Sequence, residues 1–126
     1  MGEVIELTPA ETVGFERAQV DALYGDLGPA RAEDILCRAL HQMMSRLERA
    51  DAGFRAENTV AAQKHLRRLA VMSDQIGLTS LGHCARAVQQ AMKQKDRIAT
   101  AATLVRLHRN MRKSIATLGE LRDLSI

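Results

Sequence analysis

Five consecutive residues, Lys64-His65-Leu66-Arg67-Arg68, have the side-chain types that phosphoryl chemistry requires. A neutral imidazole nitrogen can attack a phosphoryl group, and neighbouring cations offset the negative charge of the transferred group. Leu66 belongs to the apolar face of a helix, so we expect the other four side chains to face solvent. His65 is therefore a candidate phosphoacceptor within a cationic surface. The alternative is a solvated cationic helix face with no chemical role.

Other kinds of catalytic or metal chemistry have no matching pattern. The sequence contains no phosphate-cradling glycine loop, no metal-binding motif and no nucleophile elbow. It also lacks a convergent acid–base pair, and a small filled helical core leaves little room for a substrate pocket. We therefore expect no metal, no cofactor and no enzymatic activity other than phosphotransfer through His65.

The charge is distributed unevenly along the chain. Residues 1–60 hold eleven acidic and six basic side chains, a net of −5, whereas residues 61–126 hold twelve basic and four acidic ones, a net of +8. A basic half indicates an acidic partner, such as phosphate, nucleic acid, an anionic lipid or an acidic protein pocket. The alternative is a solvated helix surface that balances the acidic half within one fold.

The composition is typical of a single helical domain. The chain has 126 residues, of which 46% are apolar, so we expect one domain with a folded core. The aromatic residues are Phe15, Tyr24 and Phe54. So few aromatic side chains disfavour a β-rich fold, and they provide no platform on which nucleic-acid bases could stack.

The first helix is predicted from a capping sequence. Thr8 is a suitable N-cap, Pro9 follows at the first helical position and Glu11 completes a capping box. This helix is expected to end near Tyr24, at a turn over residues 25–28. Residues 1–7 are expected to form a mobile leader.

Four longer helices are predicted from apolar residues that recur every three or four positions. The first is expected from Pro29 to Gly53, and the second from Glu57 to Gln75, with Gly77 as the stop after it. The third is expected to be capped by Thr79 or Ser80. The fourth is expected to be capped by Asp96 and stopped by Gly119. In the first of these four, the expected buried stripe includes Ile35, Ala39, Met43, Leu47 and Ala50, widened by Leu36, Leu40 and Met44. Short connections make sequential helices antiparallel neighbours. The prediction is therefore all-α: an up-down-up-down four-helix bundle with an extra short N-terminal helix, forming one domain over residues 8–126.

Targeting signals and disulfide patterns are missing from the sequence. The first residues have neither the basic region nor the apolar core of a secretory signal, and no apolar run reaches transmembrane length. Two cysteines, Cys37 and Cys84, are too few for a disulfide framework, and both are expected to be buried. We therefore expect a cytoplasmic protein that does not insert into a membrane.

Several stretches of the chain follow a pattern known from a signalling family. The first is Leu23-Tyr24-Gly25-Asp26-Leu27-Gly28, which is followed by Ile35-Leu36-Cys37-Arg38-Ala39-Leu40. The other runs from Ala61 through Leu118. Its best-marked parts are Ile76-Gly77, then Leu81, Cys84 and Val88, and finally the Asp96 turn. Together they resemble the histidine-containing phosphotransfer (HPt) domains. This resemblance implies a four-helix bundle that relays a phosphoryl group between receiver aspartates of two-component systems through one exposed histidine.

The residue at the family's histidine position is different in this chain. The active segment of HPt domains reads approximately His-x-Leu-Lys-Gly-Ser, with a second glycine ten residues after the histidine. If Gly77 is that second glycine, Arg67 occupies the histidine position, and Ala70 and Val71 replace the lysine and the first glycine. Arginine stays protonated and cannot carry a relayed phosphoryl group. The resemblance therefore implies an HPt-like scaffold without the usual phospho-histidine.

The favoured hypothesis is a signalling adaptor that docks on a receiver domain or on a histidine kinase. Receiver domains present an acidic pocket, to which a cationic surface is complementary. The residues expected to make this contact are Lys64, Arg67, Arg68 and Arg86.

Two alternatives remain open. One is an active phosphotransfer protein that uses His65, which lies two residues, or about 200° of helix rotation, from the expected position. The other is a basic helical module that binds nucleic acid or anionic lipid in a strongly salt-dependent way. Its contact residues would be Arg106, Arg109, Arg112 and Lys113.

Overall fold

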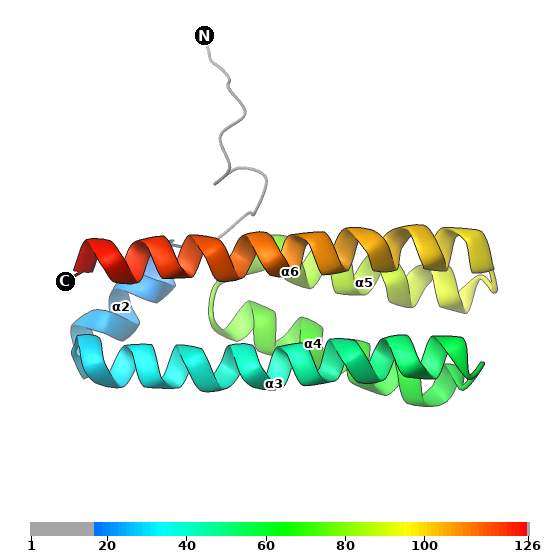
Figure 1. Cartoon of the computed structure of the whole chain (residues 1–126), viewed down its shortest axis with the longest axis horizontal. Helices are drawn as coiled ribbons and strands as arrows, with labels where there is room; N and C mark the ends of the chain where they lie inside the picture. The colour runs from blue at the N-terminus through cyan, green and yellow to red at the C-terminus, as the bar shows by residue number, and fades with distance from the viewer. Residues whose placement is uncertain (1–16, 126) are drawn as a thin grey trace, which may run out of the picture.

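A computed structural model describes residues 17–125, and this part of the chain consists of five helices and no strand. The helices are α2 (Arg17–Leu27), α3 (Pro29–Arg55), α4 (Thr59–Gln75), α5 (Thr79–Lys93) and α6 (Arg97–Ser125) (Figure 1). The all-α prediction is therefore confirmed. The predicted helix start at Thr8 and the predicted leader over residues 1–7 lie outside the described residues.

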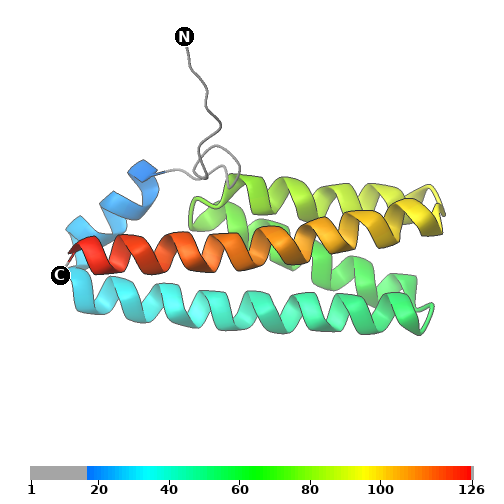
Figure 2. The same cartoon turned by 45° about the horizontal axis from the view of Figure 1, so that its top comes forward.

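The four longer helices lie side by side in a bundle-like arrangement, and α2 lies at one end of it (Figures 1 and 2). Each of them packs on the next one in the chain, and α3 also contacts α6. The helices α3 and α6 have 27 and 29 residues, whereas α4 and α5 have 17 and 15. The two short helices therefore cover only part of the length of the two long ones.

The connections between these four helices share one backbone geometry. In each connection a residue with positive φ follows the helix: Glu57 at 59°, Gly77 at 83° and Lys95 at 57°. The next N–H group donates back to a carbonyl in the last turn of the helix, as in the Schellman motif. These hydrogen bonds join Asn58 N to Gly53 O at 2.7 Å, Leu78 N to Ser73 O at 2.8 Å and Asp96 N to Ala91 O at 3.2 Å. Each chain reversal therefore takes only three residues, which keeps consecutive helices close together.

The residue that closes each connection is also the N-cap of the following helix. Asp96 Oδ1 accepts a hydrogen bond from Ala99 N at 2.9 Å, so the predicted Asp96 cap is confirmed. Asn58 Oδ1 accepts one from Ala61 N at 3.1 Å. At the start of α5, however, Leu78 occupies the N-cap position and provides no side-chain cap. The predicted N-caps Thr79 and Ser80 therefore lie one and two residues too late, because the Schellman turn ends on Leu78.

Three predicted helix ends at glycine are wrong. The helix α2 continues through Gly25 to Leu27, α3 continues through Gly53 to Arg55, and α6 continues through Gly119 to Ser125. Gly53 instead allows α3 and α4 to approach, because a Cβ atom there would lie 3.0 Å from Ala62 N. The break between α2 and α3 falls at Gly28, whose φ is 82°.

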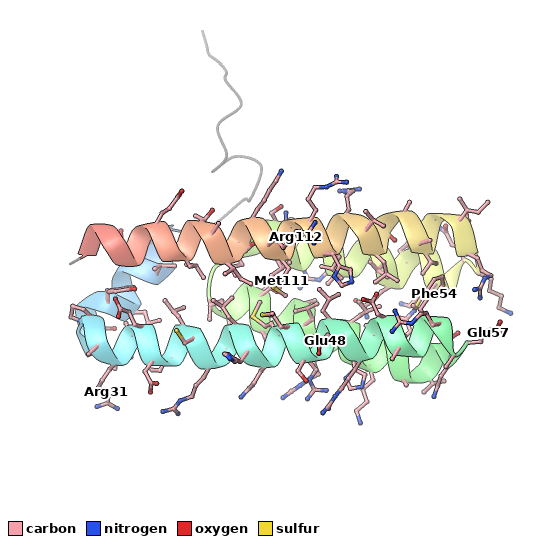
Figure 3. All side chains as sticks on the ribbon, in the orientation of Figure 1. Arg31, Glu48, Phe54, Glu57, Met111 and Arg112 are labelled. Atoms are coloured by element: carbon pink, nitrogen blue, oxygen red, sulfur yellow. The ribbon has the colours of Figure 1, made fainter. Side chains whose placement is uncertain are left out.

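The core contains apolar side chains from all five helices, and Met111 points from α6 toward α3 in Figure 3. In α4, α5 and α6 the fully buried apolar residues include Leu66, Leu69, Leu81, Val88 and Leu107. In α3 the buried face is narrower than predicted, because Ile35 and Met44 lie at its edges and are 38% and 43% exposed. Cys84 is buried as predicted, whereas Cys37 is exposed.

Candidate functional site

The predicted site lies on residues 64–68 of α4, and the side chains of these residues point in three directions around the helix axis. Leu66 is fully buried in the core, as predicted. Lys64, Arg67 and Arg68 are exposed, whereas His65 is only half-exposed. The prediction that His65 faces solvent together with the cations is therefore only partly correct, because the packing of α3 against α4 covers one side of the imidazole.

His65 faces α3, where Arg46 contacts it. The Arg46 Nη1 atom lies 3.0 Å from His65 Nδ1. A guanidinium group has no acceptor, so Nδ1 must accept this hydrogen bond and the ring proton must sit on Nε2. Desolvation by burial lowers the pKa of His65, and the charges of Arg46, Arg49 and Lys64 lower it further. The imidazole is therefore neutral, but the lone pair that could attack a phosphoryl group is already engaged by Arg46.

Arg67 lies on the opposite flank of α4, next to α5. The same flank carries Gln63, whose Nε2 donates to Gln89 O in α5 at 2.9 Å. Between the two helices is a hollow of about 650 Å³, which we call the α4–α5 hollow. Its lining residues are Thr59, Val60, Gln63, Lys64, Arg67, Met92, Lys93 and Lys95.

Four of these lining residues are cations that form no ion pair with another described residue. Among the described residues, the ion pairs involve Asp34, Glu57, Asp74 and Asp51, and none of them includes Lys64, Arg67, Lys93 or Lys95. The side-chain oxygen of Gln63 is buried and has no hydrogen-bond partner in this part of the chain. Val60 is 82% exposed at the same hollow. The hollow thus combines an apolar surface with uncompensated positive charge.

Lys93 and Lys95 were missed by the sequence prediction. They lie at the end of α5, far from α4 in sequence, and the reversal at Gly77 returns the chain so that they meet the start of α4. The signal in the sequence is their position at the end of the helix that follows Gly77, because an antiparallel helix brings its end back to the start of α4.

The remaining predicted contact residues differ in their surroundings. Arg68 is exposed on the outer face of α4. Arg86 forms an ion pair with Asp74 in the last turn of α4, and the two side chains are 46% and 45% exposed. The charge of Arg86 is therefore largely compensated, and the structure does not group it with the unpaired cations.

The four basic residues of α6 predicted to form a stripe lie only partly at a hollow. Arg106, Arg109 and Lys113 line a second hollow, of about 270 Å³, between α5 and α6. Arg112 is exposed but does not line this hollow (labelled in Figure 3). All four side chains are exposed, and three of them line this hollow.

Within residues 17–125, no group of three His, Cys, Asp or Glu side chains is arranged so that it could hold a metal ion. In the same part of the chain, no helix is both long and apolar enough to cross a membrane.

The chain is thus an all-α protein with a bundle-like fold and a cationic hollow beside Arg67. No family model matches it, and neither a curated protein nor a solved structure matches it.

Proposed function

We propose that this protein is an HPt-like docking module of a two-component phosphorelay. In this proposal its helices form an antiparallel up-down-up-down four-helix bundle, and the protein acts in the cytoplasm on a receiver domain or a histidine kinase. It binds that partner without carrying a phosphoryl group.

The observation that carries the proposal is the environment of Arg67. Arg67 stands where the HPt pattern has its histidine, and it is exposed at the α4–α5 hollow without an acidic partner among the described residues. Lys64, Lys93 and Lys95 surround the same hollow, and Val60 and Met92 contribute apolar surface. A partner surface that has carboxylates beside apolar side chains is complementary to this arrangement.

The state of His65 supports docking without phosphotransfer. Nucleophilic attack requires an accessible nitrogen lone pair, and the Nδ1 lone pair accepts a hydrogen bond from Arg46. Nε2 carries the proton in this tautomer and would have to lose it first. The hydrogen bond from Arg46 therefore opposes the use of His65 as a phosphoacceptor.

The test is a binding measurement by calorimetry against a panel of unphosphorylated receiver domains. Arg67→Glu reverses the central charge, and we expect it to weaken binding by about tenfold or more. Arg31→Glu is the matched control, because it makes the same charge reversal at an exposed arginine that lies at the far end of α3 from the α4–α5 hollow (Figure 3). We expect the control to change the affinity by less than about twofold.

Three results would contradict the proposal. One is the absence of binding to any receiver of the panel. Another is equal weakening by Arg67→Glu and Arg31→Glu, which would indicate a non-specific charge effect. The third is transfer of an acid-labile label from a phosphorylated receiver to this protein that disappears in His65→Ala, which would establish active phosphotransfer.

A further inference from the structure

A second cationic hollow lies between α5 and α6, which are side by side in Figures 1 and 2. We call it the α5–α6 hollow. Its lining residues are Ser80, Cys84, Arg106, Arg109, Asn110 and Lys113, and its volume is about 270 Å³. It shares no lining residue with the α4–α5 hollow. The two hollows are therefore separate features, one on each flank of α5.

Three of its side chains carry positive charge. Arg106, Arg109 and Lys113 are spaced three and four residues apart, so they lie on one face of α6. Within residues 17–125, none of the three forms an ion pair. Like charges held this close repel one another, and an anion bound between them would remove that repulsion.

The thiol beside these cations does not neutralise them. Cys84 is buried, and Arg106 lies beside its thiol in the lining of the hollow. Burial raises the pKa of the Cys84 thiol, and Arg106 opposes this effect only in part. The thiol is therefore uncharged at neutral pH and does not offset the positive charge of the three cations.

The polar residues of the hollow are fixed in place by hydrogen bonds. Asn110 is 8% exposed, and its Nδ2 atom donates to Ser80 Oγ at 3.0 Å. The Asn110 Oδ1 atom accepts from Ser114 Oγ at 3.3 Å. A buried amide is costly unless its hydrogen bonds are made, so this network holds the amide in one orientation. The cations thus lie beside polar side chains that these hydrogen bonds hold in place.

We propose that the α5–α6 hollow binds a phosphate group. Two guanidinium groups can each donate a pair of hydrogen bonds to phosphate oxygens, and a lysine adds a point charge. Three cations exceed the charge of one phosphate dianion, so the bound state is not left with excess negative charge. The volume of the hollow is at the lower limit for small-molecule pockets, which suits a single phosphate group with a small substituent. Three of the four basic residues of α6 line the hollow and Arg112 does not, so the proposed site is smaller than the predicted four-residue stripe.

The experiment is a titration of isotope-labelled protein with inorganic phosphate, followed by two-dimensional amide NMR spectra. Chloride at equal ionic strength serves as the reference. We expect saturable shifts at Ser80 and Asn110 and around Arg109. Arg109→Gln should weaken phosphate binding by about tenfold, whereas Arg112→Gln on the same helix should change it by less than about twofold. Both side chains are exposed, so both variants are expected to fold, and their spectra report this directly.

The phosphate group could belong to a soluble compound or to a lipid headgroup, and a second arm separates these sources. Vesicles of phosphatidylcholine with phosphatidic acid are sedimented with the wild type and with Arg109→Gln. Co-sedimentation that phosphate competes away, and that Arg109→Gln abolishes, identifies a headgroup. Phosphate binding without co-sedimentation identifies a soluble phosphate.

Other outcomes would overturn this proposal. They are the absence of saturable shifts, equal shifts with chloride, and equal weakening by Arg109→Gln and Arg112→Gln. Binding of duplex DNA that is weakened by Arg112→Gln and not competed by phosphate would favour a nucleic-acid surface instead. By contrast, the proposal predicts that Arg67→Glu, at the separate α4–α5 hollow, leaves phosphate binding unchanged.

Discussion

A residue with positive φ follows each of α3, α4 and α5. Replacing a glycine at such a position should lower the free energy of unfolding, whereas introducing a glycine should raise it. Gly77 adopts this conformation without a steric penalty, whereas Glu57 adopts nearly the same conformation with a side chain. A residue with a Cβ atom pays about 1–2 kcal/mol in the left-handed region. Glycine loses about 0.4–1 kcal/mol through its greater freedom in the unfolded chain. The net difference is about 1 kcal/mol in favour of glycine at both positions.

We therefore expect Gly77→Ala to lower the free energy of unfolding by about 1 kcal/mol and Glu57→Gly to raise it by a similar amount. Urea unfolding followed by far-ultraviolet circular dichroism measures both, with an unchanged slope. The corresponding shifts in Tm are about 3–5 °C in opposite directions. Glu57→Gln is the control for the loss of the exposed pair between Glu57 and Arg97, whose atoms are 3.9 Å apart. A Gly77→Ala protein as stable as the wild type, or a Glu57→Gly protein less stable than Glu57→Gln, would refute this reasoning.

Other predictions concern the core, His65 and the cysteines. Leu66→Ala removes a fully buried side chain and should cost about 2–5 kcal/mol in urea unfolding. The pKa of His65 lies below its usual value of 6.5 in the folded state, so the unfolded chain binds the proton first as the pH falls. The contribution of His65 to stability is therefore complete above pH 6.5 and decreases below it, and His65→Gln should be less sensitive to this pH change. NMR titration of Arg46→Gln should give a higher pKa for His65, since a nearby cation is lost. A maleimide should modify the exposed Cys37 rapidly, whereas Cys84 should react only after unfolding.

Local chemistry made part of the fold predictable. The Asp96 cap, the Pro29 start and the Gly77 stop each depend on residues close in sequence, and the structure has all three. The role of Gly53 was not predictable, because it depends on how closely α3 approaches Ala62 in α4. The sequence alone does not distinguish a glycine that ends a helix from a glycine that allows a neighbouring helix to pack closely.

The candidate site was also predictable only in part from the sequence. The exposure of Lys64, Arg67 and Arg68 follows from the position of Leu66 on the buried face of α4. The hydrogen bond from Arg46 to His65 depends on which face of α3 meets α4. Periodicity identifies the buried face of each helix, but it does not determine which flanks of two helices come together.

The most direct test of the docking proposal is to map the surface that a receiver domain contacts. Isotope-labelled protein is titrated with the receiver of the panel that binds it most tightly, and the amide shifts are followed by NMR. The proposal predicts shifts concentrated at residues 60–68 of α4 and at residues 92–95, around the α4–α5 hollow. Shifts concentrated on α2, or on the flank of α5 that faces α6, with residues 60–68 unaffected, would contradict it.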